Sequence, residues 1–257
     1  MQIFIWVFLA ILCSEALLVS SLHIIPKLGG FGKDMVPILT KAPGLDIIVS
    51  LFIWVPWAVG IAINGILGLI AALSAQLIVM ESWIIIHEFA HRKTAQGSRI
   101  HGFLDRKFGW WRNNVALWAT ALAVPVFFVI RFAEAFVYPI LVWVLDFPDY
   151  KHNEWVNVSR QKFEGLIGKD LIWCLYCDWM TGVYSLGAEM LRNVESFWCP
   201  IRFYDGKKCD NCKLDFPDIE EGWVAADGNM DDVEQVLQQK YGEEERSWFG
   251  HPDRQQH

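Results

Sequence analysis

Long apolar stretches constrain the fold of this 257-residue chain more than any other feature of its sequence. These stretches cover residues 3–25, 47–86 and 114–147. Their charged side chains are few, namely Glu15, Glu81, Arg131, Glu134 and Asp146. A helix needs about 20 apolar residues to cross the hydrocarbon core of a membrane, which is about 30 Å thick. The stretches therefore predict helices that span a membrane.

The second and third stretches are long enough for two short crossings each, so we predict hairpins with turns near Asn64-Gly65 and near Arg131. The first stretch lacks the basic segment and the cleavage site of a signal peptide, so we predict a retained anchor. The expected fold is an all-α integral membrane protein. It would be a helical bundle of about five membrane segments, followed by a small Cys-rich module and an acidic tail.

The sequence divides into three expected regions. Residues 1–150 would form the transmembrane bundle, with a basic cytosolic loop at 87–113. Residues 151–216 would form the Cys-rich module, which we expect to bind metal. Residues 217–257 would form the acidic tail, which includes a short amphipathic helix.

The basic residues predict the orientation of the chain. Lys and Arg are concentrated in the loops at 26–45 and 92–112, and short basic loops stay on the cytosolic side of a membrane. Both loops can lie inside only if residues 47–86 cross twice, which places the N-terminus outside and the Cys-rich module in the cytosol. Residues 171–188 could cross as well, but Asp178 would then cost about 2.5–3.5 kcal/mol in the bilayer. We therefore favour a helix that lies against the membrane.

Charge also restricts the partners of the chain. From Glu189 to the end there are sixteen Asp and Glu against eight Lys and Arg, which argues against a nucleic-acid partner. The basic 92–112 loop ends at Trp110 and Trp111, and this combination predicts contact with membrane lipid. The expected partners are therefore membrane lipid and a membrane protein, either as substrate or as a partner subunit.

The pentad His87-Glu-Phe-Ala-His91 lies at the end of the second apolar stretch. In a helix, His87 and His91 are one turn apart on the same face, so both imidazoles can bind one zinc ion. Glu88 points about 100° away from His87 and could be the base that deprotonates a zinc-bound water. The alternative is that these residues are only the polar end of a membrane helix.

The pentad and its apolar lead-in resemble the motif of membrane-embedded HExxH zinc metallopeptidases. The resemblance implies a zinc-dependent hydrolase with His87 and His91 as ligands, Glu88 as catalytic base and a membrane protein or peptide as substrate. It also implies a third ligand, for which the candidates are His101, Asp149, His152, Glu164 and Glu189. Glu88 and His91 could instead form half of the di-iron carboxylate site of a membrane oxidase, with Asp149 and His152 as the other half and Glu81 or Glu134 as a further ligand.

Five of the six cysteines lie between residues 174 and 212. Cys174 and Cys177 form one CxxC pair, Cys209 and Cys212 form another, and Cys199 lies between them. Two such pairs are typical of a four-thiolate zinc site, with an iron–sulfur cluster as the alternative. In a cytosolic region, a bound metal is favoured over disulfides. The first pair could also be small buried residues of an apolar helix.

Two classes of function follow from these motifs. In the first, the chain is a membrane-embedded zinc hydrolase that uses the pentad. In the second, it is a non-catalytic or electron-transfer subunit of a membrane complex, with a Cys-based zinc or iron–sulfur site. The discriminating residue is Glu88, because the hydrolase requires its carboxylate as a base and the subunit does not.

Overall fold

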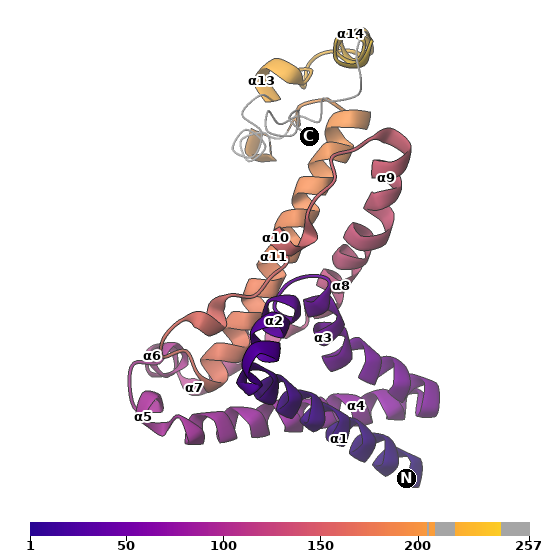
Figure 1. Cartoon of the computed structure of the whole chain (residues 1–257). Coiled ribbons are helices and arrows are strands. Elements are labelled where there is room, and N and C mark those ends of the chain that lie inside the picture. The colour runs from indigo at the N-terminus through magenta and orange to yellow at the C-terminus, as the bar shows by residue number, and fades with distance from the viewer. Residues whose placement is uncertain (205, 209–218, 243–257) are drawn as a thin grey trace. The chain divides into compact units, whose positions relative to one another are not determined.

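The computed structural model describes residues 1–204, 206–208 and 219–242 (Figure 1). Every regular element within these ranges is a helix. Three helical stretches are long and apolar enough to cross a membrane, namely Gln2–Lys27, Trp54–Ala90 and Trp110–Leu145. These stretches are consistent with the predicted all-α membrane protein, while the number of crossings and their orientation stay predictions.

The chain divides into two compact units. Unit 1 comprises residues 1–123 and 152–182, and unit 2 comprises residues 124–151 and 183–257. The boundary after residue 182 lies inside one long helix, α11 (Gly168–Trp198). Unit 1 contains the HEFAH pentad, and unit 2 contains the described part of the tail.

Unit 1 is built on helices α1 (Gln2–Ile24) and α4 (Trp54–Ala90), which pack along each other (Figure 1). Small side chains on α4 allow the two backbones to approach closely. The buried core of this interface consists of Val7, Ile11, Ala71, Ala72 and Ala75. Membrane helices associate through such small residues because lipid is as apolar as their side chains, so that close packing has to supply the attraction.

Polar groups also contribute to this interface. The Gln76 side chain accepts a hydrogen bond from the Trp57 indole (2.7 Å) and donates one to the Phe52 carbonyl oxygen (2.6 Å). The carboxyl group of Glu15, which is buried, lies beside Gln76. Inside a membrane such groups need partners within the protein, because no water is present to replace them.

Helix α4 is interrupted at Asn64-Gly65, where the sequence predicts a turn. Both residues leave the helical conformation, and Gly65 has a φ of 55°, which favours glycine. On either side of the interruption, Gly60 and Gly68 face each other so closely that a Cβ on one would meet the backbone of the other. The predicted position of the interruption is thus confirmed.

Short helices connect the longer ones in unit 1. They are η1 (Ile25–Lys27), α2 (Gly29–Leu39), α3 (Gly44–Phe52), α5 (Arg92–Ala95), α6 (Ile100–Phe108), α7 (Trp110–Ala121), α10 (His152–Trp155) and η3 (Arg160–Lys162). The segment after α2 pairs with the segment after α10 through two backbone hydrogen bonds of 2.9 Å, from Ala42 to Val156 and from Val158 to Thr40. This pairing ties the two sequence segments of unit 1 together.

The apolar stretch 171–188 lies within α11, which is not among the three stretches that are long and apolar enough to cross a membrane. The carboxylate of Asp178 accepts hydrogen bonds from the N–H groups of Ser159 (2.6 Å) and Arg160 (3.1 Å). Asp178 therefore orders the loop before α11. This role fits the expectation of a helix outside the hydrocarbon core, and whether the stretch crosses stays a prediction.

In unit 2, helix α8 (Val124–Phe132) continues through the π-helix η2 (Ala133–Val137) into α9 (Tyr138–Leu145). The chain is therefore helical through Arg131, and the predicted turn there is wrong. The physical reason is that Arg131 Nη1 and Glu134 Oε2 form a buried ion pair of 2.8 Å. An ion pair between residues three apart neutralises both charges on one helix face, so neither charge has to reach water at a turn.

The described part of the tail contains helices α13 (Ile219–Gly222) and α14 (Met230–Tyr241). Helix α14 is the predicted amphipathic helix. Asp231 and Glu234 also have the spacing of a capping box, but the structure forms the box from other residues. The box is formed by Asn229, whose side chain accepts the Asp232 N–H (3.3 Å), and by the Asp232 carboxylate, which accepts the Asn229 N–H (2.9 Å). Asparagine is as good an N-cap as aspartate, so the spacing alone could not decide.

Candidate functional site

The HEFAH pentad forms the C-terminal end of α4, where His91 follows the last helical residue, Ala90. The His87 and His91 rings lie side by side with a centroid separation of 4.4 Å, as their one-turn spacing predicts. Trp83 stacks on the other side of His87 at 4.6 Å. His23 of α1 approaches the same ring, with a centroid separation of 6.0 Å. The pentad thus ends the helix with a row of aromatic rings.

The hydrogen bonds of the two histidines determine which ring nitrogens can bind a metal. His87 Nδ1 accepts the backbone N–H of Gly168 (3.1 Å). A neutral imidazole has only one nitrogen that can accept, so His87 carries its proton on Nε2 and has no free lone pair for a metal. His91 is different, because its Nδ1 donates to the His87 carbonyl oxygen (3.0 Å) and leaves Nε2 as a free acceptor.

Glu88 binds the same helix terminus as His87. Its Oε1 accepts the backbone N–H of Lys169 at 3.2 Å. Gly168 and Lys169 are the first two residues of α11, whose N–H groups have no acceptor within the helix. The pentad therefore caps the N-terminus of α11 from another helix, and the carboxylate also interacts favourably with the positive end of the helix dipole.

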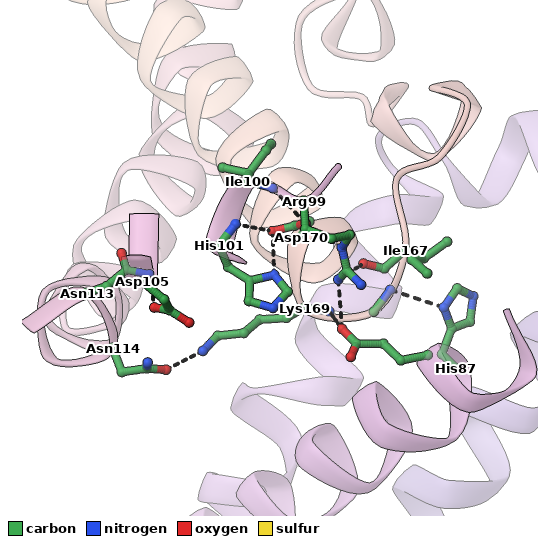
Figure 2. A network of polar contacts seen from close by, with 12 residues as sticks. His87, Arg99, Ile100, His101, Asp105, Asn113, Asn114, Ile167, Lys169 and Asp170 are labelled. Atoms are coloured by element: carbon green, nitrogen blue, oxygen red, sulfur yellow. Dashed lines mark hydrogen bonds and ion pairs between the residues drawn. The ribbon is translucent and has the colours of Figure 1, made fainter. Parts of the chain in front are cut away.

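A second cap runs in the opposite direction (Figure 2). Asp170, in the first turn of α11, accepts the backbone N–H groups of Ile100 (3.2 Å) and His101 (3.0 Å), which begin helix α6. Its carboxylate also accepts His101 Nδ1–H at 3.0 Å. The N-terminus of α6 is therefore capped by α11, while the N-terminus of α11 is capped by α4.

Arg99, which precedes α6, connects the two caps. Its Nη2 lies 2.7 Å from Glu88 Oε1 and its Nε lies 2.8 Å from Asp170 Oδ2. Nη2 also donates to the Ile167 carbonyl oxygen at 3.0 Å. We call the side chains of His87, Glu88, Arg99, His101 and Asp170, together with the N-terminus of α11, the capping junction.

The charges of the capping junction nearly balance. Two carboxylates face one guanidinium and two helix N-termini, each of which acts as about half a positive charge. Burial by itself would raise the pKa of Asp170, but the hydrogen bonds from Arg99 and His101 outweigh it and hold the pKa below its ordinary value. For Arg99, burial would lower the pKa, and the bonds to Asp170 and Glu88 raise it instead. Both groups are therefore charged at neutral pH.

Gly168 is the one glycine that the capping junction requires. Its φ is +52°, in the left-handed region that favours glycine. A Cβ at this position would also meet the side chain of Glu88. The close approach of Glu88 to the start of α11 therefore depends on the absence of a side chain here.

The predicted metal donors are brought together only in part. Among residues 1–204, 206–208 and 219–242, no group of three His, Cys, Asp or Glu is arranged to hold a metal ion. Of the candidate third ligands, His101 is bonded to Asp170 instead. Two others, Asp149 and Glu189, belong to unit 2, whereas the pentad belongs to unit 1. Zinc and iron at the pentad therefore stay predictions.

The cysteines are distributed over both units. Cys174 and Cys177 lie on α11 and line a small cavity of about 170 Å³ next to His101. Burial raises the pKa of the Cys174 thiol, which makes the thiolate that binds metals less accessible at neutral pH. Cys199 belongs to unit 2, and Cys209 and Cys212 lie outside the described residues. The four-thiolate site is therefore still a prediction.

Arg99 and Asp170 are central to the capping junction, and neither was predicted from the sequence as a site residue. A partial signal is present, because Gly168-Lys169-Asp170 has the glycine and the acid that often mark a helix start. No local pattern links this start to Glu88, which is 81 residues from Lys169. No protein-family model, curated protein or solved structure matches the chain, so known proteins do not indicate which residues form its site.

Proposed function

We propose that this chain is a non-catalytic subunit of a membrane complex, and that the HEFAH pentad is a structural helix end. The observation that supports this proposal most is that both His87 and Glu88 cap the N-terminus of α11. These are the two groups that a hydrolase would need as metal ligand and as base. In their present bonds, they perform a structural role.

The environment of Glu88 adds to this argument. A general base at a zinc site must accept a proton from metal-bound water on its carboxylate. Glu88 Oε1 instead receives Arg99 at 2.7 Å and the Lys169 N–H at 3.2 Å. The guanidinium competes with a water molecule for the same oxygen. The pairing also opposes a di-iron site, in which Glu88 would be a ligand.

The remaining parts of the proposal concern the partner and the metal. Three long apolar helical stretches expose many large side chains, as expected of surfaces that meet lipid or another membrane protein. A Cys-based zinc or iron–sulfur site in residues 174–212 belongs to the same proposal. It is supported by the spacing of the two CxxC pairs, and it would give the subunit a structural or electron-transfer role.

The proposal is tested by comparing Glu88→Gln, Glu88→Ala and His91→Ala in the purified full-length chain. Glu88→Gln keeps an acceptor for the Lys169 N–H, so we expect a smaller loss of thermal stability than for Glu88→Ala. His91→Ala is the matched control, because His91 belongs to the pentad but caps nothing in α11. Its thermal stability should stay close to that of the wild type.

Zinc content, measured by mass spectrometry of the same samples, separates this proposal from the hydrolase. We expect the zinc content to be the same in the wild type and in His91→Ala, whatever the cysteines bind. The proposal would be overturned if His91→Ala lost one zinc per chain and Glu88→Gln kept that zinc but abolished cleavage of a membrane peptide.

A further inference from the structure

A cavity of about 600 Å³ lies between α4, α7 and the first turn of α11, next to the capping junction. Its wall includes Glu81, Asn114, Lys169 and the tryptophans at positions 110, 111 and 118. The cavity therefore combines one acid, one base and three indole rings. None of these side chains takes part in the capping bonds described above.

The positive group of this cavity is held in place. The Lys169 ammonium group donates to Asn114 Oδ1, as Figure 2 shows. Asn114 is fixed in turn, because its Nδ2 donates to the Trp110 carbonyl oxygen at 2.7 Å. An ammonium group has three donor hydrogens, so Lys169 keeps two for a ligand. Its position at the start of α11 adds the positive end of a long helix.

The negative group is in an unusual position for a charge. Glu81 is exposed and lies within the apolar stretch Trp54–Ala90, about 14 Å before the end of α4 at 1.5 Å per residue. In the part of the chain that the structure describes, no Lys, Arg or His lies within ion-pairing distance of it. An acid within a membrane helix is costly without a partner. A cationic ligand would supply that partner.

The three tryptophans lie on α7 and line the same cavity. Trp110 and Trp111 are largely exposed, and Trp118 is anchored by an edge-to-face contact with Trp173 at 5.4 Å. Indole faces attract ammonium cations through the negative charge of the ring face. Tryptophan is also typical of the level at which lipid headgroups lie.

An apolar track leads away from the cavity along α4. Leu77 and Ile78 lie four and three residues before Glu81, so they share its helix face and lie further into the apolar stretch. Both are well exposed, at 46% and 47%. A molecule that places a cation at Glu81 could therefore lay a hydrocarbon chain along the same face.

We propose that this cavity binds the headgroup of a phospholipid that carries an ammonium cation beside its phosphate, such as phosphatidylethanolamine or phosphatidylcholine. The phosphate binds the Lys169 ammonium group, and the cation binds Glu81 and the tryptophan faces. The acyl chains follow Leu77 and Ile78. Both charges of the headgroup then meet an opposite charge, which an anionic lipid without an ammonium group cannot achieve.

The test is a titration of the purified full-length chain in detergent with phosphatidylethanolamine or phosphatidylglycerol of matched acyl chains, followed by native mass spectrometry. We expect one phosphatidylethanolamine to bind about tenfold more tightly than phosphatidylglycerol. In Glu81→Gln this ratio should fall to about one, because the cation loses its partner. Lys169→Gln should weaken the binding of both lipids, because both carry a phosphate.

Trp6→Leu is the matched control for Trp111→Leu. Both tryptophans are about equally exposed, at 71% and 70%, but Trp6 lies on α1 and does not line the cavity. Only Trp111→Leu should reduce binding. The proposal is overturned if the wild type shows no preference between the two lipids, or if the preference survives Glu81→Gln. It is also overturned if Trp6→Leu reduces binding as much as Trp111→Leu.

Discussion

The α1–α4 interface and the capping junction lie at different places along α4 and hold unit 1 together in opposite ways. In the α1–α4 interface, three alanines are completely buried against α1, and the polar groups are few. In the capping junction, two carboxylates accept the free N–H groups of two helices, and a guanidinium pairs with both carboxylates. The difference is consistent with helices that cross a membrane, because charges are costly within hydrocarbon but can be balanced by helix termini where a membrane helix ends.

The largest expected effect is that of breaking the capping junction at its centre. Arg99→Ala leaves two carboxylates without their guanidinium, and the Asp170 side chain is only 5% exposed. Removal of one partner from such a buried pair costs about 3–5 kcal/mol. We expect a loss of this size in the free energy of unfolding. Arg99→Lys, which keeps the charge but not the planar fork, should lose less. Wild-type stability in Arg99→Lys would contradict the bidentate role of Arg99, and an equal loss in both variants would contradict the contribution of its charge.

A smaller effect is expected from overpacking the α1–α4 interface. Ala72 is completely buried in it, and a larger side chain would push α1 away from α4. Ala72→Leu should cost about 1–3 kcal/mol in chemical unfolding. Ala62→Leu is the control, because Ala62 is exposed on the same helix. If both variants unfolded alike, the close packing of α1 on α4 would be refuted.

The contribution of the capping junction to stability should depend on pH, because it includes the charged Asp170. The folded-state pKa of Asp170 lies below its ordinary value of 3.8. Its charged form therefore stabilises the fold above that value, and this contribution is lost as the pH falls through the folded-state pKa. We expect the difference in melting temperature between the wild type and Asp170→Asn to be constant from pH 8 to pH 5. Below about pH 4 the difference should shrink, and a difference that grows there would contradict the assignment.

The smallest expected loss of stability is that of Glu15→Gln in the α1–α4 interface, which we compare with Glu88→Gln in the capping junction. Glu15→Gln should change the unfolding free energy by about 0.6 kcal/mol, the average for polar contacts between membrane helices. Glu15 lies beside an amide and not beside a cation, so its charge contributes little. Glu88→Gln should cost more, because the ion pair with Arg99 loses its charge. Equal losses would remove the distinction between the two regions.

The features of the fold that local patterns determine were predicted well. The apolar stretches became the long helices, and Asn64-Gly65 interrupts α4 as expected, since glycine adopts the required positive φ without strain. The predicted turn near Arg131 was wrong, because a charged residue within an apolar stretch does not have to reach water. The structure instead pairs Arg131 with Glu134 within the same helical stretch.

The candidate site was predicted only in part, because its decisive contacts are not local. The spacing of His87 and His91 correctly placed the two rings together. What their nitrogens and Glu88 bind depends on Arg99 and on the start of α11, far along the chain. Periodicity and spacing within the motif contain no information about such a partner. A zinc site and a capping junction therefore look the same in the sequence.

The separation between Glu88 and α11 has a consequence for the synthesis of the chain. Lys169 is 81 residues further on, so the ribosome needs about 4–16 s to reach it at roughly 5–20 residues per second. During that interval Glu88 has no helix terminus to bind, although the apolar part of α4 is already complete. Arg99 follows Glu88 by only 11 residues, so the ion pair can form long before the helix terminus is made. The ion pair and the two caps of the capping junction are therefore completed at different times.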